Sequence, residues 1–197
     1  MIKSKKYNKT YSYKLVEELM ESGMELLMPY VDKMKSDDVR NFTMDALAMA
    51  PPYFWVIPSN KHKFHPKWTR GDGGLVKHTE FALYLAEELC DTYSLLNIEK
   101  DIVLSAVILH DTLKNGMAID DHYGVFHPFL PRAYYKKLSK KYNEAYYDDI
   151  MCAIESHMGD IATGKWTPIG RIHPRMDVDK VVHLADYIAS RPRLGFK

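Results

Sequence analysis

The fold is decided most clearly by the stretch Ile102-Val103-Leu104-Ser105-Ala106-Val107-Ile108-Leu109-His110-Asp111. An almost continuous apolar run of this kind is typical of a helix that is buried on all sides, and it is too short to span a membrane. An imidazole and a carboxylate follow directly after the run, where an unpaired carboxylate would be costly. A bound metal ion would remove that cost, and so would a nearby Lys or Arg side chain.

The rest of the chain predicts an all-α fold, because apolar residues recur at helical spacing in several further segments. We expect helices over residues 13–34, 37–50, 75–93, 98–113, 144–157 and 178–190, and another helix, rich in Tyr and Lys, after Pro131. Asp37 or Asp38 can cap the second helix. Segments 51–74, 114–130 and 159–176 contain Gly and Pro and are predicted to be loops.

Composition indicates an ordinary globular protein, since 46% of the 197 residues are hydrophobic and 27% are charged. We expect a loose basic arm over 1–12, to which we assign no function, and a single domain over 13–197. The net charge of +1 gives no strong signal for duplex nucleic acid. Without a membrane span or signal peptide, and with Cys90 and Cys152 expected as reduced thiols, the sequence predicts a cytoplasmic protein.

The chemistry-bearing residues form an ordered set of four imidazoles and two carboxylates: His78, His110, Asp111, His127, His157 and Asp186. Each His taken singly is more often a core or surface residue than a ligand. Two carboxylates in apolar segments together with several imidazoles instead favour a site for one or two divalent ions, which the chemistry leaves as Mn, Fe, Co, Ni, Zn or Mg.

The other histidines have weaker claims to a role. Lys61 and His65 lie in the loop before the first ligand and are predicted to contact a substrate phosphate. His122 and His173 are expected to be exposed to solvent. His183, three residues before Asp186, is interpreted as a satisfied core residue rather than a partner of the ligands.

Four stretches resemble the HD-domain metal-dependent phosphohydrolases: Gly73-Gly74-Leu75-Val76-Lys77-His78-Thr79, Leu109-His110-Asp111-Thr112-Leu113-Lys114, Ser156-His157-Met158-Gly159 and His183-Leu184-Ala185-Asp186. Ile57-Pro58-Ser59-Asn60-Lys61 adds a similarity to the branch with YhaM-type exoribonucleases and small phage or bacterial relatives. The resemblance covers about residues 55–190 and implies an HD-type helical bundle. It implies one metal held by His78, His110, Asp111 and Asp186. In family members that bind two metals, it implies a second ion whose site is completed by His127 and His157, with Asp111 as the bridge between the two ions.

The chain also departs from some relatives. Lys114 stands where His-Asp-x-x-Glu members carry the Glu, and Met158 stands where some relatives have a second consecutive His, which argues against a third metal. No RNA-binding OB-type domain precedes the matching region, so we expect a nucleotide or short oligonucleotide as the substrate rather than processive exoribonuclease activity.

These features predict hydrolysis of a phosphoester or phosphoanhydride by a metal-activated hydroxide. Asp111 and Lys114 are the predicted catalytic residues, and Lys61, His65 and Lys114 the predicted substrate contacts. For Lys114, a salt bridge to a ligand carboxylate is an equally good interpretation. Two other functions stay open: a di-iron oxygenase similar to inositol oxygenase-like members, and a non-catalytic nucleotide-binding module. The sequence also leaves open whether the protein is a homo-oligomer.

Overall fold

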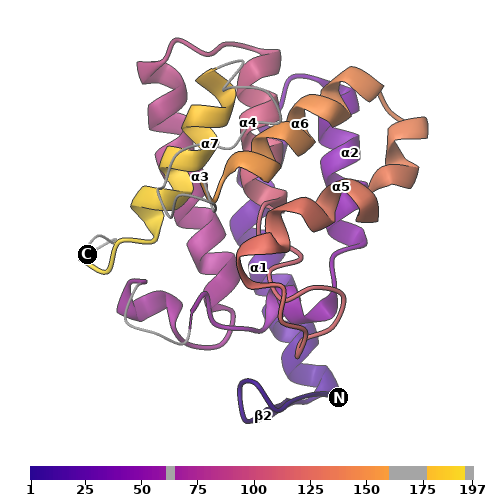
Figure 1. The fold of residues 1–197 in the computed structure, drawn as a ribbon, viewed down its shortest axis with the longest axis vertical. Helices are drawn as coiled ribbons and strands as arrows, with labels where there is room; N and C mark the ends of the chain where they lie inside the picture. The colour runs from indigo at the N-terminus through magenta and orange to yellow at the C-terminus, as the bar shows by residue number, and fades with distance from the viewer. Residues whose placement is uncertain (61–64, 160–176, 194–197) are drawn as a thin grey trace.

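The computed structural model describes residues 1–60, 65–159 and 177–193, and within them it is a helical bundle (Figure 1). Its α-helices are α1 (Tyr13–Asp32), α2 (Asp37–Ala48), α3 (Gly74–Thr92), α4 (Ile98–Leu109), α5 (Leu130–Tyr134), α6 (Glu144–Ser156) and α7 (Asp177–Ala189). The predicted all-α class is therefore confirmed. None of the helices in these ranges has the length and apolar character needed to cross a membrane.

Helix α4 is the central element of the bundle. Every residue from Asp101 to Leu109 is buried, and the helix packs against α2, α3, α6 and α7. Figure 1 shows α7 beside α3, although these helices are far apart in the sequence. Because α4 is surrounded in this way, the residues that follow Leu109 emerge among several helix ends.

The helix boundaries differ slightly from the predicted ones. Ser36, rather than Asp37 or Asp38, caps α2, because its side chain accepts a hydrogen bond from Val39 N. Helix α4 ends at Leu109 instead of residue 113, since residues 112–116 continue as tight turns with bonds such as Lys114 N to Asp111 O (3.0 Å). The predicted helix after Pro131 is short and already begins at Leu130. A 3-10 helix, Lys136–Lys140, follows it.

The expectation of a loose N-terminal arm is wrong. Strands β1 (Ile2–Ser4) and β2 (Lys9–Tyr11) form an antiparallel hairpin with Ile2 opposite Tyr11. Tyr11 is only 1% exposed. The Asp120 carboxylate accepts hydrogen bonds from Ser4 Oγ (2.6 Å) and from the backbone N–H of the next two residues. These partners are more than 110 positions away, so no local pattern could predict them.

Backbone hydrogen bonds before α3 join the described residues that precede and follow positions 61–64. Gly73 N donates to Val56 O and Leu75 N to Ile57 O, each at 3.0 Å. A Cβ atom on Gly74 would lie 2.0 Å from Thr69 O, so only glycine allows this close approach. The packing fixes the start of α3, the helix that carries the first predicted ligand.

Candidate metal centre

All six predicted ligands meet in one buried place. His78 comes from α3, His110 and Asp111 follow the end of α4, and Asp186 comes from α7. The other two are His127, on the 3-10 helix Gly124–Phe129, and His157, which caps the end of α6. All six residues are buried, and the most exposed of them is 6% exposed. The predicted set spans 108 positions of the sequence, from His78 to Asp186, and the fold brings its members together.

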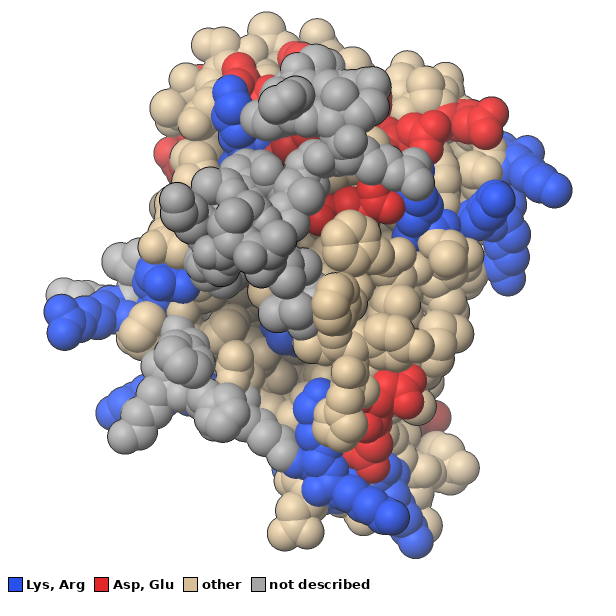
Figure 2. Space-filling view, in the orientation of Figure 1, with Lys and Arg blue, Asp and Glu red and all other residues tan. Residues whose placement is uncertain are grey.

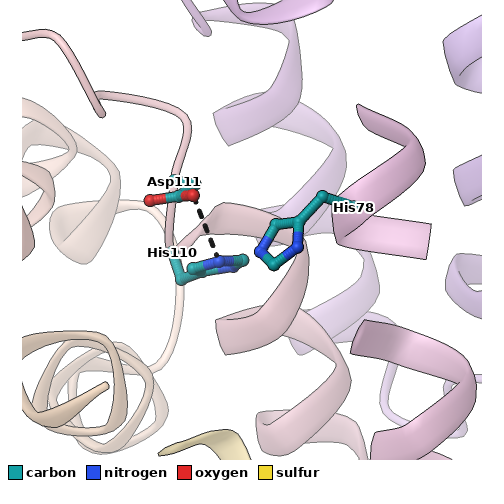
Figure 3. A group of neighbouring side chains, drawn as sticks. All are labelled: His78, His110 and Asp111. Atoms are coloured by element: carbon teal, nitrogen blue, oxygen red, sulfur yellow. Dashed lines mark ion pairs between the residues drawn. The ribbon is translucent and has the colours of Figure 1, made fainter. Parts of the chain in front are cut away.

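One half of the cluster gathers around His110. Its Nε2 atom lies 3.5 Å from Asp111 Oδ2 and 3.6 Å from Asp186 Oδ1. Asp186 Oδ1 is also 2.9 Å from His78 Nε2. Figure 3 shows the rings of His78 and His110 pointing toward each other, with Asp111 beside His110. Two groups of three ligand atoms within 4.8 Å of one another result: His78, His110 and Asp111, and His110, His157 and Asp186.

The other half gathers around the second oxygen of Asp111. Asp111 Oδ1 lies 2.9 Å from His127 Nε2 and 3.9 Å from His157 Nε2, and the two Nε2 atoms are 3.1 Å apart. These residues form a third group within 4.8 Å. Asp111 therefore faces both halves, one oxygen to each, as expected of a ligand that bridges two ions. The buried groups could hold a metal ion.

Backbone carbonyls orient three of the imidazoles in the same way. The Nδ1 atoms of His110, His127 and His157 lie 2.6–2.7 Å from the carbonyl oxygen three residues earlier in the chain. A carbonyl can only accept, so each Nδ1 must carry the proton, and each neutral ring presents a lone pair on Nε2. Carbonyl partners of this kind are typical of metal-ligating histidines.

This tautomer pattern leaves acceptors facing acceptors. In the neutral rings of His127 and His157, two lone pairs would meet at 3.1 Å beside a carboxylate oxygen. His110 Nε2 is buried and has no hydrogen-bond partner among the residues described. Such an arrangement requires a cation between the atoms, either a proton or a metal ion. The donor set therefore fits a divalent ion.

Burial and mutual contacts shift the pKa values of Asp111, Asp186 and His157 toward their ligating forms, whereas at His110 the neighbouring carboxylates outweigh burial and raise the pKa. Burial alone would raise the pKa of Asp111, but the Lys114 ammonium and the neighbouring imidazoles hold it well below its usual range. Burial would also raise the pKa of Asp186, but the neighbouring imidazoles of His110 and His78 lower it well below its usual range. Burial lowers the pKa of His157 to about 3. Ionised carboxylates and a neutral imidazole are the forms that bind metals.

Lys114 forms a salt bridge with a ligand carboxylate, which was one of the two interpretations that the sequence left open for it. Its ammonium pairs with Asp111 Oδ2, and its side chain is 22% exposed against 2% for Asp111. Burial would lower the pKa of Lys114, but the Asp111 carboxylate raises it above its usual value. Lys114 is therefore a charged partner of a ligand at the more exposed edge of the cluster.

His65 lies beside the cluster, as its predicted role requires. It is buried, and its ring centroid is 5.0 Å from that of His78. Burial lowers its pKa to about 3, so its ring is neutral at physiological pH. Lys61, the other predicted phosphate contact, lies outside the described residues, as does His173.

Two further histidines match their interpretation from the sequence. His183 is buried and its Nδ1 donates to His157 O (2.8 Å), which ties α7 to the end of α6. It is a satisfied core residue, and this bond also supports the backbone of a ligand. His122 is exposed.

The sequence reasoning missed the neighbours of Lys114. Asn115 is 2% exposed, and its Nδ2 donates to Ile119 O (2.7 Å) and to the Tyr7 hydroxyl (3.2 Å). An Asn after the Lys was the only available signal, and it is a weak one, because one of its partners, Tyr7, comes from the distant N-terminal hairpin.

No family model, curated protein or solved structure matches this chain. The resemblance to HD-domain phosphohydrolases therefore stays a prediction, and the function has to be inferred from the geometry of the candidate metal centre.

Proposed function

We propose that the chain is a metal-dependent hydrolase that cleaves a phosphoester or phosphoanhydride bond in a nucleotide or short oligonucleotide. The observation that carries the proposal is the pair of ligand groups joined by Asp111, one containing His78 and His110 and the other His127 and His157. Two adjoining groups on one carboxylate suit the two-ion sites that are common among phosphate-ester hydrolases.

The donor set bears on the identity of the ion. Four imidazoles outnumber two carboxylates, and imidazole favours transition metals such as Mn, Fe, Co, Ni or Zn over Mg. When bound, ions of this kind supply a water of lowered pKa and neutralise phosphate oxygens.

The remaining work falls to the side chains of the chain itself. Asp111 joins the two halves of the site and fixes their spacing. Lys114, charged and at the exposed edge, is placed to neutralise charge on a phosphate that enters from solvent. His65 is neutral and buried beside His78, and its Nδ1 has no hydrogen-bond partner within the described part of the chain, so it can contact a substrate oxygen without adding charge.

The test is metal analysis of the purified protein combined with a phosphate-release screen over mono-, di-, tri- and cyclic nucleotides. We expect at least one transition metal ion per chain and release of phosphate or a nucleotide product. The control is His110→Ala, which removes a ligand shared by two of the groups and should abolish both metal retention and turnover. Iron with oxygen consumption and no phosphate release would favour the di-iron oxygenase. Nucleotide binding without turnover would favour the non-catalytic module.

A further inference from the structure

The N-terminal hairpin docks on the segment that follows His110 and Asp111. Ser4 and the backbone of Lys5 and Lys6 all bond to the Asp120 carboxylate. These bonds lower the pKa of Asp120 to about 2, so the carboxylate stays ionised and the docking persists at any physiological pH. The hairpin is therefore a fixed part of the molecule beside residues 114–121.

Docking brings Lys6 and Tyr7 to Asn115. Lys6 Nζ donates to Asn115 Oδ1 (2.5 Å), lies 3.5 Å from Asp121 O, and stands 5.7 Å from the centroid of the Tyr7 ring. Asn115 adjoins Lys114, whose ammonium pairs with Asp111. Tyr7 is close enough for the charges of Lys114 and Asp111 to act on its hydroxyl. Asn115 therefore bonds to the ammonium group of the hairpin, and its neighbour in the sequence carries the ammonium group that pairs with the ligand carboxylate.

The more exposed of the site residues mark where a ligand can enter. Lys114 is 22% exposed and pairs with Asp111, whereas the ligands are almost fully buried, so of these residues only Lys114 offers a path from solvent to the cluster. Figure 2 shows one face of the molecule with a hollow that contains basic side-chain atoms, and with more Lys and Arg side chains, beside acidic ones, at its lower end. A substrate that places one phosphate at the ligand cluster would extend its next charged group along this path.

The charge of Lys6 suits such a group. An ammonium has three protons, and a hydrogen bond to an anionic oxygen is about twice as strong as one to a neutral amide oxygen. A phosphate oxygen can therefore compete with Asn115 Oδ1 for Lys6 without moving the hairpin.

We propose that the docked hairpin forms one wall of the entrance to the metal centre, and that Lys6 binds a second phosphate group of the substrate. The inference rests on the proposed function and narrows it. The site should prefer nucleotides with at least two phosphates over monophosphates.

The test compares the binding of two probes by isothermal titration calorimetry in the presence of excess Mn²⁺. The probes are adenosine monophosphate and the non-hydrolysable adenosine 5′-(α,β-methylene)diphosphate, measured on the full chain. Lys6→Gln removes the charge but keeps a donor for Asn115. We expect it to weaken diphosphate binding about tenfold, the value of one charge-assisted hydrogen bond at a partly exposed site, and to leave monophosphate binding unchanged.

Two controls separate the local contact from general charge. Lys3→Gln removes the same charge from an exposed position on the same hairpin and should leave both affinities unchanged, and Lys6→Arg should retain the preference. As a measurement that needs no variant, the diphosphate preference of the wild-type chain should shrink as KCl is raised, because salt screens the contact.

Any of four results would overturn the inference. Lys6→Gln could lose affinity equally for both probes, or lose none for the diphosphate. Lys3→Gln could lose as much diphosphate affinity as Lys6→Gln, or the diphosphate preference of the wild type could be independent of salt. A wild-type chain that binds the diphosphate no more tightly than the monophosphate would overturn it as well. An active, metal-loaded enzyme with any of these results would leave the proposed function intact. A chain that retains no metal and releases no phosphate would overturn the proposed function, while the probe titrations would still report on Lys6.

Discussion

Replacing Lys114 by Met removes the ammonium that pairs with the Asp111 carboxylate. In the metal-free protein this leaves a carboxylate that is 2% exposed without its cationic partner. Breaking a fully buried ion pair costs about 3–5 kcal/mol. Lys114 is partly exposed, and the imidazoles of His110 and His127 remain near the carboxylate. We therefore expect the metal-free variant to be less stable by about 2 kcal/mol, which corresponds to about 4–8 °C in Tm for a domain of this size.

The same substitution should act in the opposite direction on metal binding. A cation bound by Asp111 takes over the role of the ammonium, so the loss of stability should largely disappear when the metal is present. Because coupling between two sites is reciprocal, Lys114→Met should bind the metal more tightly. A coupling of about 1.4 kcal/mol would make the dissociation constant about tenfold smaller. Turnover should nevertheless fall by on the order of 10²-fold if Lys114 also stabilises charge on the substrate.

Urea denaturation with EDTA and with saturating metal, together with a metal titration, measures each of these quantities. The control is Lys100→Met, which breaks the surface ion pair with Asp91 (3.2 Å, with Asp91 74% exposed) and should change stability by less than about 0.5 kcal/mol. If metal-free Lys114→Met is as stable as the wild type, or binds metal no more tightly, the ion pair with Asp111 neither stabilises the metal-free fold nor competes with the metal. Full retention of kcat would make Lys114 a structural partner only.

Three further outcomes are expected. Asp111→Ala should abolish turnover and lower the metal content measured by mass spectrometry, because the residue faces both halves of the cluster, and unchanged metal content would refute its bridging position. Gly74→Ala should lower the free energy of unfolding in urea by about 2 kcal/mol or more, since the new Cβ would lie 2.0 Å from a backbone oxygen, whereas Gly71→Ala, with open space around it, should be nearly neutral. Burial raises the pKa of Cys90 to about 12; its thiolate is therefore scarce well below that pH, and alkylation by iodoacetamide should stay slow at Cys90 from pH 7 to 9 in the native protein. Cys152, which is partly exposed, should react first, and rapid labelling of Cys90 would contradict its burial.

The ligand set could be predicted from the sequence because its signal is local at each position. A carboxylate at the end of an apolar helix, as at Asp111, is anomalous wherever it occurs, and the order of the imidazoles supplied the rest. The helix periodicities were equally local, which is why the all-α class is confirmed while individual boundaries move by a few residues.

The hairpin could not be predicted, because nothing in residues 1–12 is decisive by itself. Tyr11 is buried in the folded protein, and Ser4 Oγ donates to Asp120, which is 116 positions away. A short hairpin is marginal in isolation, so its pairing depends on tertiary contacts that a local pattern does not contain. For the same reason, the sequence does not indicate the hydrogen bond between Tyr7 and Asn115, which are 108 positions apart.

The separation between His78 and Asp186 has a further consequence in terms of chain topology. Side chains 108 positions apart meet at 2.9 Å, and the other ligands lie between them in the sequence. An ion held by this set would act as a non-covalent cross-link, closing loops whose entropy the unfolded chain would otherwise keep. Helices α3, α4, α6 and α7 would then lose their native contacts together rather than one by one, so metal binding would make unfolding more cooperative.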